Sequence, residues 1–288
     1  MTLRKATRQK SKIRLGLSAV AGGGKTYSAL LIASGMTSWD KIALIDTENG
    51  SGDLYEHLGA YNVLPIEAPY TPEKYIQAIK TCEDAGMEVI IIDSITHEWD
   101  GEGGCLEIQT KAGGRYQDWA KVTPRHVAFI QAILKSKCHV ITTVRRKQDY
   151  EMTNEGNRIS VKKVGLKEVT REGFEYELTA NLEIELNHFA SASKDRTGLF
   201  LDKPSFIPSS ETGKAILNWC NSGVAPLPKE DTRPLLTDDA FDKYIDRIKL
   251  GEIDLFDKIK GYYNLNSDQL DTLMDAVMYA SEPKEDVV

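Results

Sequence analysis

Several features that would define a membrane or secreted protein are missing from this sequence. Its longest convincing hydrophobic run, VIII at 89–92, is far too short to span a bilayer. The basic N-terminal stretch MTLRKATRQKSK lacks an apolar h-region, so we expect no secretory signal. No C-x-x-C pair occurs among the four cysteines, Cys82, Cys105, Cys138 and Cys220. This spacing argues against a zinc site or a disulfide framework and favours a reduced, cytoplasmic setting without membrane contact.

The sequence also lacks an overall positive charge, since its net charge is −7. This negative charge is unevenly distributed along the chain. The net charge of −7 resides entirely in residues 229–288, which hold eight Lys or Arg against fifteen Asp or Glu. Residues 1–228 are neutral, and the first 14 residues carry six positive charges and no acid. The acidic composition therefore does not exclude a nucleic-acid partner for the main body.

The hydrophobic pattern predicts strands alternating with helices, which indicates an α/β fold with a mostly parallel sheet. Strands are expected at 13–19, 41–46, 88–93 and 138–144, and helices at 26–36, 72–85, 123–136 and 211–220. The polar segment 145–170 is expected to form a loop or hairpin. The alternation at 181–193 and 198–201 predicts a late antiparallel hairpin.

The length of 288 residues suits one large α/β domain with a small appendage. We expect five segments: a basic arm at 1–12, the core at 13–222, a linker at 223–236, a small acidic helical region at 237–281 and a disordered tail at 282–288.

The stretch AVAGGGKT, residues 19–26, follows a predicted strand and precedes a predicted helix, as a phosphate-binding loop does. Its glycines allow backbone N–H groups to turn toward phosphate oxygens. Lys25 is expected between the β- and γ-phosphates, and the Thr26 hydroxyl is expected on Mg²⁺. The alternative is a glycine-rich turn that only starts a helix. The expected nucleotide contacts are Ala19, Val20, Ala21, Gly22, Gly23, Gly24, Lys25, Thr26 and Tyr27.

Two acidic residues at predicted strand ends complete the pattern. Asp93 ends VIIID and is suited to the Mg²⁺ shell, although an aspartate there can also simply cap the next turn. Glu48 follows the strand ending at Asp46 and is suited to polarise the attacking water. The alternative for Glu48 is a solvated loop glutamate.

This combination resembles the RecA ATPase core over roughly residues 13–220. The stretches KVGLKEVTREGFEYEL and SKDRTG are most similar to small phage-encoded RecA-like ATPases of single-strand annealing and recombination. The resemblance implies a RecA-like P-loop NTPase core, with the mostly parallel sheet and late hairpin, plus a C-terminal helical appendage. It also implies ATP and Mg²⁺ as cofactors, Glu48 as the catalytic glutamate, and the cytoplasm of an infected bacterial host.

The resemblance extends to three further positions. Tyr55 lies where RecA proteins place an aromatic ring on adenine, although a core tyrosine is an equal alternative. Thr143 lies at the end of the fourth strand, where the family usually has a polar sensor, often glutamine. A threonine hydroxyl is shorter than a glutamine amide, and Arg145 is a candidate to replace it.

Two segments are candidates for contact with single-stranded DNA. Residues 145–171 carry a net charge of +4 and follow the fourth strand, where RecA-like proteins have a DNA-binding loop. A second candidate is the glycine-rich stretch 100–119. The alternative for both is a solvated loop. The candidate residues are Arg145, Arg146, Lys147, Tyr150, Arg158, Lys162, Lys163 and Arg115.

Lys194 and Arg196 share one strand face by the period-two rule. In RecA and DnaB-like cores such a pair faces the neighbouring subunit, where a cation on the γ-phosphate contributes about 10³–10⁵ in rate. The alternative is a surface salt-bridge pair.

The predicted function is therefore a RecA-like ATPase that assembles on single-stranded DNA as a filament or ring. A single-strand-binding protein or another recombination protein is a further expected partner. The alternatives are a hexameric DnaB-like motor or helicase loader, a small-molecule kinase, and an ATP-gated scaffold without DNA activity.

Overall fold

The computed structural model describes the chain except for residues 1–2, 4, 156–157, 225–232 and 282–288, and its side chains except also for 148–165, 267 and 281. The predicted tail and most of the predicted linker lie outside the described residues. The chain divides into two compact units, Met1–Ala225 and Pro226–Val288.

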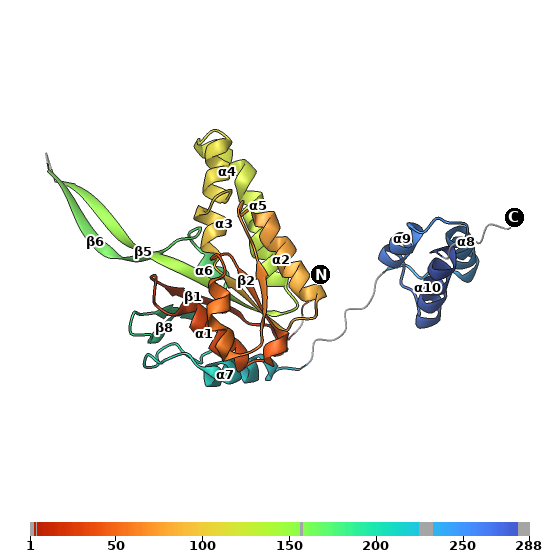
Figure 1. Ribbon diagram of the computed structural model, residues 1–288, viewed down its shortest axis with the longest axis horizontal. Coiled ribbons are helices and arrows are strands. Elements are labelled where there is room, and N and C mark those ends of the chain that lie inside the picture. The colour runs from red at the N-terminus through yellow and green to blue at the C-terminus, as the bar shows by residue number, and fades with distance from the viewer. Residues whose placement is uncertain (1–2, 4, 156–157, 225–232, 282–288) are drawn as a thin grey trace. The chain divides into compact units, whose positions relative to one another are not determined.

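The first unit is built on one large sheet with strand order β3-β2-β4-β5-β1-β7-β8, and β6 pairs with β5 (Figure 1). Strands β1 to β5 and β7 pair in parallel, whereas β6 and β8 are antiparallel to their neighbours. The predicted α/β fold with a mostly parallel sheet and a late hairpin is confirmed. The strands are Arg14–Ala19 (β1), Ile42–Asp46 (β2), Asn62–Pro65 (β3), Val89–Asp93 (β4), His139–Glu155 (β5), Arg158–Glu168 (β6), Ala180–Ile184 (β7) and Ala190–Asp195 (β8).

Helices cover both faces of this sheet, which explains why β1, β2 and β4 are buried along their whole length. Helices α1 and α7 pack on one face, and α2 and α5 pack on the other. The helices of this unit are Lys25–Ser34 (α1), Pro72–Asp84 (α2), Thr96–Asp100 (α3), Cys105–Lys111 (α4), Trp119–Lys135 (α5), Phe174–Glu177 (α6) and Ser210–Asn221 (α7).

Strand β5 changes partners at Arg145. Up to Arg145 it pairs with β1 inside the sheet, and from Arg146 it pairs with β6 in a separate antiparallel ribbon. Figure 1 shows this β5–β6 ribbon extending away from the body of the unit. The hairpin predicted for 145–170 is thus present, and its base is joined directly to the centre of the sheet.

Two local expectations from the sequence need correction. Residues 198–201 form a turn rather than a strand, because the Asp195 carboxylate accepts hydrogen bonds from the backbone of Thr197, Phe200 and Leu201. The stretch 100–119 is not one open loop, because it contains α4 and a 3₁₀ turn at Tyr116–Asp118.

The second unit is a small helical bundle with its own apolar core. Its helices are Asp238–Lys249 (α8), Leu255–Tyr262 (α9) and Ser267–Ser281 (α10), and they lie in the segment 237–281 that is expected to be helical. Phe241, Ile245 and Ile248 of α8 pack with Ile259 of α9 and Leu273 of α10. Among the helices in the described parts of the chain, none combines the length and apolar content needed to cross a membrane.

Helices α1 and α7 approach each other so closely that their contact requires glycine. A Cβ on Gly213 would lie 1.9 Å from the Ile32 carbonyl oxygen, and one on Gly35 would lie 1.9 Å from that of Ser210. We expect Gly213→Ala to lower the free energy of unfolding by about 1–3 kcal/mol, because the two backbones must separate. Denaturant unfolding measures this change.

The control is Asn218→Ala, on the exposed side of the same helix. It should leave stability within about 0.5 kcal/mol of the unmodified protein. Equal unfolding midpoints for the two variants would contradict the proposed close contact.

Candidate active site

The loop between β1 and α1 has a backbone that only glycine adopts readily. Gly22 and Gly24 have φ angles of 79° and 81°, in the left-handed region. A Cβ on Gly23 would lie 2.7 Å from that of Ala19. Helix α1 begins at Lys25, directly after this turn, so its first N–H groups face the loop. The geometry suits a bound anion such as phosphate.

The strand order gathers polar side chains beside this loop. Strands β1, β2, β4 and β5 are parallel, so their carboxyl ends meet at one edge of the sheet. Strand β5 lies between β1 and β4. Asp46 and Asp93 end β2 and β4 at this edge, and Thr143 lies inside β5, opposite Leu17 of β1.

Asp93 is buried and accepts two short hydrogen bonds. The hydroxyls of Thr26 and Thr143 donate to Oδ2 and Oδ1 respectively, each at 2.5 Å. Burial raises the pKa of Asp93, and the hydrogen bonds from Thr143 and Thr26 lower it. The Thr26 hydroxyl and the Asp93 carboxylate place two hard oxygen ligands side by side. Oxygen ligands of this kind fit a Mg²⁺ ion.

Lys25 is buried in the same loop, with Nζ donating to the Val20 carbonyl oxygen at 3.3 Å. Burial lowers its pKa, and the nearby carboxylates of Asp93 and Glu48 act in the opposite direction. The ammonium is thus held in place before any anion arrives.

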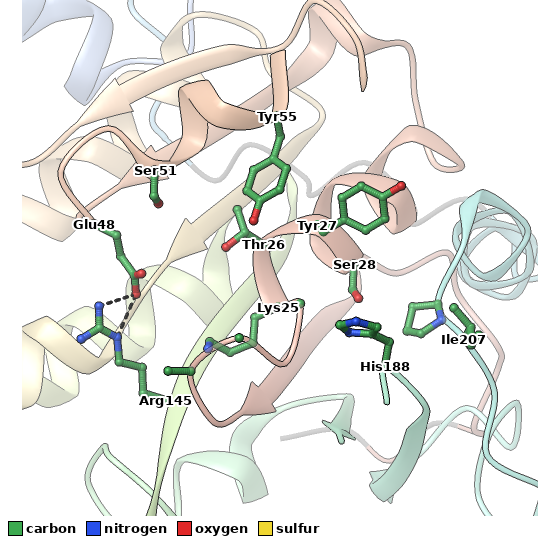
Figure 2. A pocket seen from close by; sticks show the side chains of 14 residues that line it. Lys25, Thr26, Tyr27, Ser28, Glu48, Ser51, Tyr55, Arg145, His188 and Ile207 are labelled. Carbon is green, nitrogen blue, oxygen red and sulfur yellow. Dashed lines mark hydrogen bonds and ion pairs between the residues drawn. The ribbon is translucent and has the colours of Figure 1, made fainter. Parts of the chain in front are cut away.

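Glu48 forms an ion pair with Arg145 at the wall of this site (Figure 2). Arg145 Nη2 and Nε lie 2.9 and 3.0 Å from the same oxygen, Oε1. The backbone N–H of Glu48 donates to Asp46 Oδ1 at 2.6 Å, which fixes the turn after β2. The carboxylate is oriented by Arg145 through one oxygen.

These residues surround a cavity of about 700 Å³. On one side Tyr27 and Tyr55 meet edge to face with ring centroids 6.0 Å apart, and His188 and Ile207 lie on the other (Figure 2). The lining residues are Ala21, Gly22, Gly24, Lys25, Thr26, Tyr27, Ser28, Glu48, Ser51, Tyr55, Arg145, His188, Ile207 and Pro208. The volume and the mixture of charged and aromatic walls suit a nucleotide.

Residues 11–208 match the AAA domain family. The chain belongs to this AAA domain family. It is therefore a P-loop ATPase. A solved structure described as "a prototypical ATPase from the type III secretion system of pathogenic bacteria" aligns at 13% identity with a TM-score of 0.40. That alignment covers 99% of this chain and 83% of the other. No curated protein matches this chain.

Not every predicted nucleotide contact of the AAA domain lines the cavity. Ala19, Val20 and Gly23 are not among the lining residues, and neither is Thr143, which is buried with its hydroxyl on Asp93. Thr143 thus contacts the aspartate rather than the open cavity.

The cavity also contains residues that the sequence analysis did not single out, notably His188, Ile207 and Pro208. His188 has a φ of 68°, and its Nδ1 lies 3.4 Å from the Gly23 carbonyl oxygen. Residues 188 and 207–208 come from beyond β7, and no local motif in the sequence marks them.

Lys194 and Arg196 lie outside this cavity. Arg196 follows the end of β8 at Asp195, so the two residues do not share a strand face, but both side chains donate to the carbonyl oxygen of Tyr176. Among the described residues neither forms an ion pair with an acid. In this structure Lys194 and Arg196 are therefore not a surface salt-bridge pair.

Several candidate DNA contacts are paired with acids in the structure. Arg146 binds Glu183 at 2.8 Å, Lys147 binds Asp100 at 2.9 Å, and Arg115 binds Asp118 at 3.3 Å. The side chains of the other candidates, Tyr150, Arg158, Lys162 and Lys163, lie outside the described part of the chain.

The double hydrogen bond to Asp93 generates a prediction for Thr143→Val. This change keeps the shape but leaves one buried carboxylate oxygen without its donor. We expect a loss of about 1–3 kcal/mol in the free energy of unfolding near pH 7. Removing the donor raises the pKa of Asp93 further, so the loss should grow as the pH rises through the already raised pKa of the folded protein and should shrink in acid.

Urea unfolding across a series of pH values, from acid to well above neutral, tests this pH dependence. Thr143→Ser, which keeps the hydroxyl, is the control and should show little pH-dependent change. A loss for Thr143→Val that stays constant across the whole series would show that Asp93 is not the group affected.

Proposed function

We propose that this protein is a RecA-like ATPase that assembles on single-stranded DNA and promotes phage recombination, by annealing or strand exchange, in the bacterial cytoplasm. The observation that carries this proposal is the position of Glu48. It follows β2 and lines the same cavity as Lys25, while β5 separates the strand of the glycine loop from the strand of Asp93. This arrangement provides a carboxylate for water activation in addition to the phosphate loop.

This function assigns roles to several residues of the cavity and to two buried residues beside it, Asp93 and Thr143. The ammonium of Lys25 and the N–H groups of the loop bind the phosphates, and Tyr27 and Tyr55 contact the base. Thr26 and Asp93 would hold Mg²⁺, which neutralises charge on the β- and γ-phosphates. Thr143 keeps the Asp93 carboxylate in place.

Glu48 takes the role of the group that orients and polarises the attacking water. Nη2 and Nε of Arg145 both bind Oε1 of Glu48. The other carboxylate oxygen, Oε2, is therefore available for a water molecule. Arg145 thus acts as a positioning residue for the carboxylate, and its guanidinium lies within the cavity wall.

The DNA contact is assigned to the β5–β6 ribbon. A two-stranded ribbon on its own is only marginally stable in water, so a binding partner would stabilise it. Its segment, 145–171, has a net charge of +4, which suits the phosphate backbone. Because phosphate contacts carry no sequence information, little sequence preference is expected.

Lys194 and Arg196 are assigned to the γ-phosphate site of a neighbouring subunit. They are cationic, lack acidic partners in the described part of the chain, and lie outside their own cavity. Oligomerisation as a filament or ring would therefore complete the ATP site. The acidic C-terminal unit is proposed to bind a single-strand-binding protein or another recombination protein.

ATP hydrolysis measured with and without single-stranded DNA tests this function. We expect stimulation by DNA that falls steeply with salt, because each phosphate contact releases counterions. Glu48→Gln should retain ATP binding and lose turnover by at least about 10²-fold. Glu56→Gln, an exposed acid on the 3₁₀ segment Ser51–Leu58, is the control and should behave like the unmodified protein.

The outcomes also separate the alternatives. Closed rings in particle images with DNA-stimulated hydrolysis would indicate a DnaB-like motor or loader. Binding of ATP without turnover would indicate a gated scaffold. Absence of DNA binding at low salt with ATP and Mg²⁺ would contradict the recombination function.

A further inference from the structure

Helix α6 lies directly against Lys194 and Arg196. Lys194 Nζ donates to the Glu175 carbonyl oxygen at 3.0 Å and also to that of Tyr176. Arg196 Nη2 donates to the same Tyr176 oxygen at 3.1 Å. The last carbonyl groups of a helix have no partner within the helix, so the Tyr176 oxygen is free to accept side-chain donors. The Glu175 oxygen also accepts the backbone N–H of Leu178 at 3.3 Å and shares its second lone pair with Lys194. One short helix thus binds both cations through its main chain.

These contacts hold the two side chains in place and leave some of their N–H donors unused. An ammonium has three donors, of which Lys194 uses two, and a guanidinium has five, of which Arg196 uses one. Asp195, between them in sequence, does not neutralise them, because its oxygens bind the turn at 197–201. Glu177 and Glu175 of α6 act on Lys194 electrostatically, but among the described residues no acid forms an ion pair with Lys194 or Arg196. Both cations therefore keep donors for an anion.

We infer that the carbonyl oxygens of Glu175 and Tyr176 in helix α6 position Lys194 and Arg196 for a phosphate group of the neighbouring subunit. We call this main-chain binding site on α6 the seat. This inference rests on the proposed trans role of these residues and adds the element that sets their position. It also gives the stretch TREGFEYEL a physical role, since its main chain supplies the acceptors.

The seat is connected to the base of the β5–β6 ribbon. The side-chain amide of Asn181, on β7, donates to Glu168 Oε1 and to Ser193 Oγ, each at 3.0 Å. Glu168 ends β6, and Ser193 precedes Lys194 on β8. A buried amide thus ties the ribbon to the strand that carries the two cations.

Gly173 offers a way to displace the seat without touching a cation. It precedes α6 with a φ of 92°, and a Cβ there would meet only Tyr176 Cδ2, at an ordinary 3.6 Å. Alanine at this position is therefore strained in its backbone alone, and rotation of α6 relieves that strain. Asparagine tolerates this conformation better and serves as the conservative variant.

We expect Gly173→Ala to lower the kcat for ATP by about tenfold with KM unchanged, and Gly173→Asn to retain most of the activity. The matched control is Gly86→Ala, which has the same kind of φ, 72°, and no atom within 4 Å of the added Cβ. It should keep full activity, because Gly86 follows α2, away from the seat.

Mixtures of two variants show whether the activity lost in Gly173→Ala depends on the Lys194 and Arg196 that one subunit supplies to the next. Gly173→Ala mixed with Lys25→Ala should recover activity, because the second chain supplies an intact seat to the first chain's ATP site. That recovery also shows that the Gly173→Ala chain folds and binds ATP. Gly173→Ala mixed with Arg196→Ala should not recover.

The failure of this inference is distinguishable from failure of the proposed function. If Arg196→Ala and Lys25→Ala complement each other while Gly173→Ala is fully active, only the seat is refuted. Equal losses for Gly173→Ala and Gly86→Ala would also refute it. If Arg196→Ala and Lys25→Ala fail to complement in confirmed mixed assemblies, the trans role itself is refuted, and the seat with it.

Discussion

The buried carboxylate of Asp93 is the point on which the ATP site depends. It joins three elements that are distant in sequence, because β4 supplies the aspartate, α1 supplies Thr26 and β5 supplies Thr143. A buried carboxylate is costly unless its oxygens are hydrogen-bonded. Both oxygens have a donor here, so the relative positions of the glycine loop and the two strands are fixed together.

Strand β5 connects the Asp93 site to the exposed ribbon through three of its side chains. Thr143 binds Asp93, and two residues later Arg145 binds Glu48, on the side of the cavity. The next residue, Arg146, begins the ribbon and binds Glu183 on β7. Successive side chains of a strand point to opposite faces. The base of the ribbon is therefore tied to the ATP cavity on one face and to the β7–β8 hairpin on the other.

The parts of this arrangement that could be predicted from sequence are those encoded by local backbone constraints. The glycine loop, the buried strands and the polar residues at their ends follow from short motifs and periodicity. His188 and Ile207 could not be predicted as cavity residues, because only the pairing of β7 with β1 and of β8 with β7 brings them there. The strand expected at 198–201 was wrong since alternation alone does not reveal the Asp195 carboxylate that folds this segment into a turn. The main-chain seat for Lys194 and Arg196 has no side-chain signature at all.

The central claim is that the working ATP site lies between two subunits, with Lys194 and Arg196 supplied from outside. The most direct test is the ATPase rate per chain as a function of chain concentration, with the assembly state measured in the same samples. We predict that the specific rate rises with concentration in step with assembly, while ATP binding to single chains stays constant. A specific rate that remains constant down to concentrations at which the protein is monomeric would contradict the account.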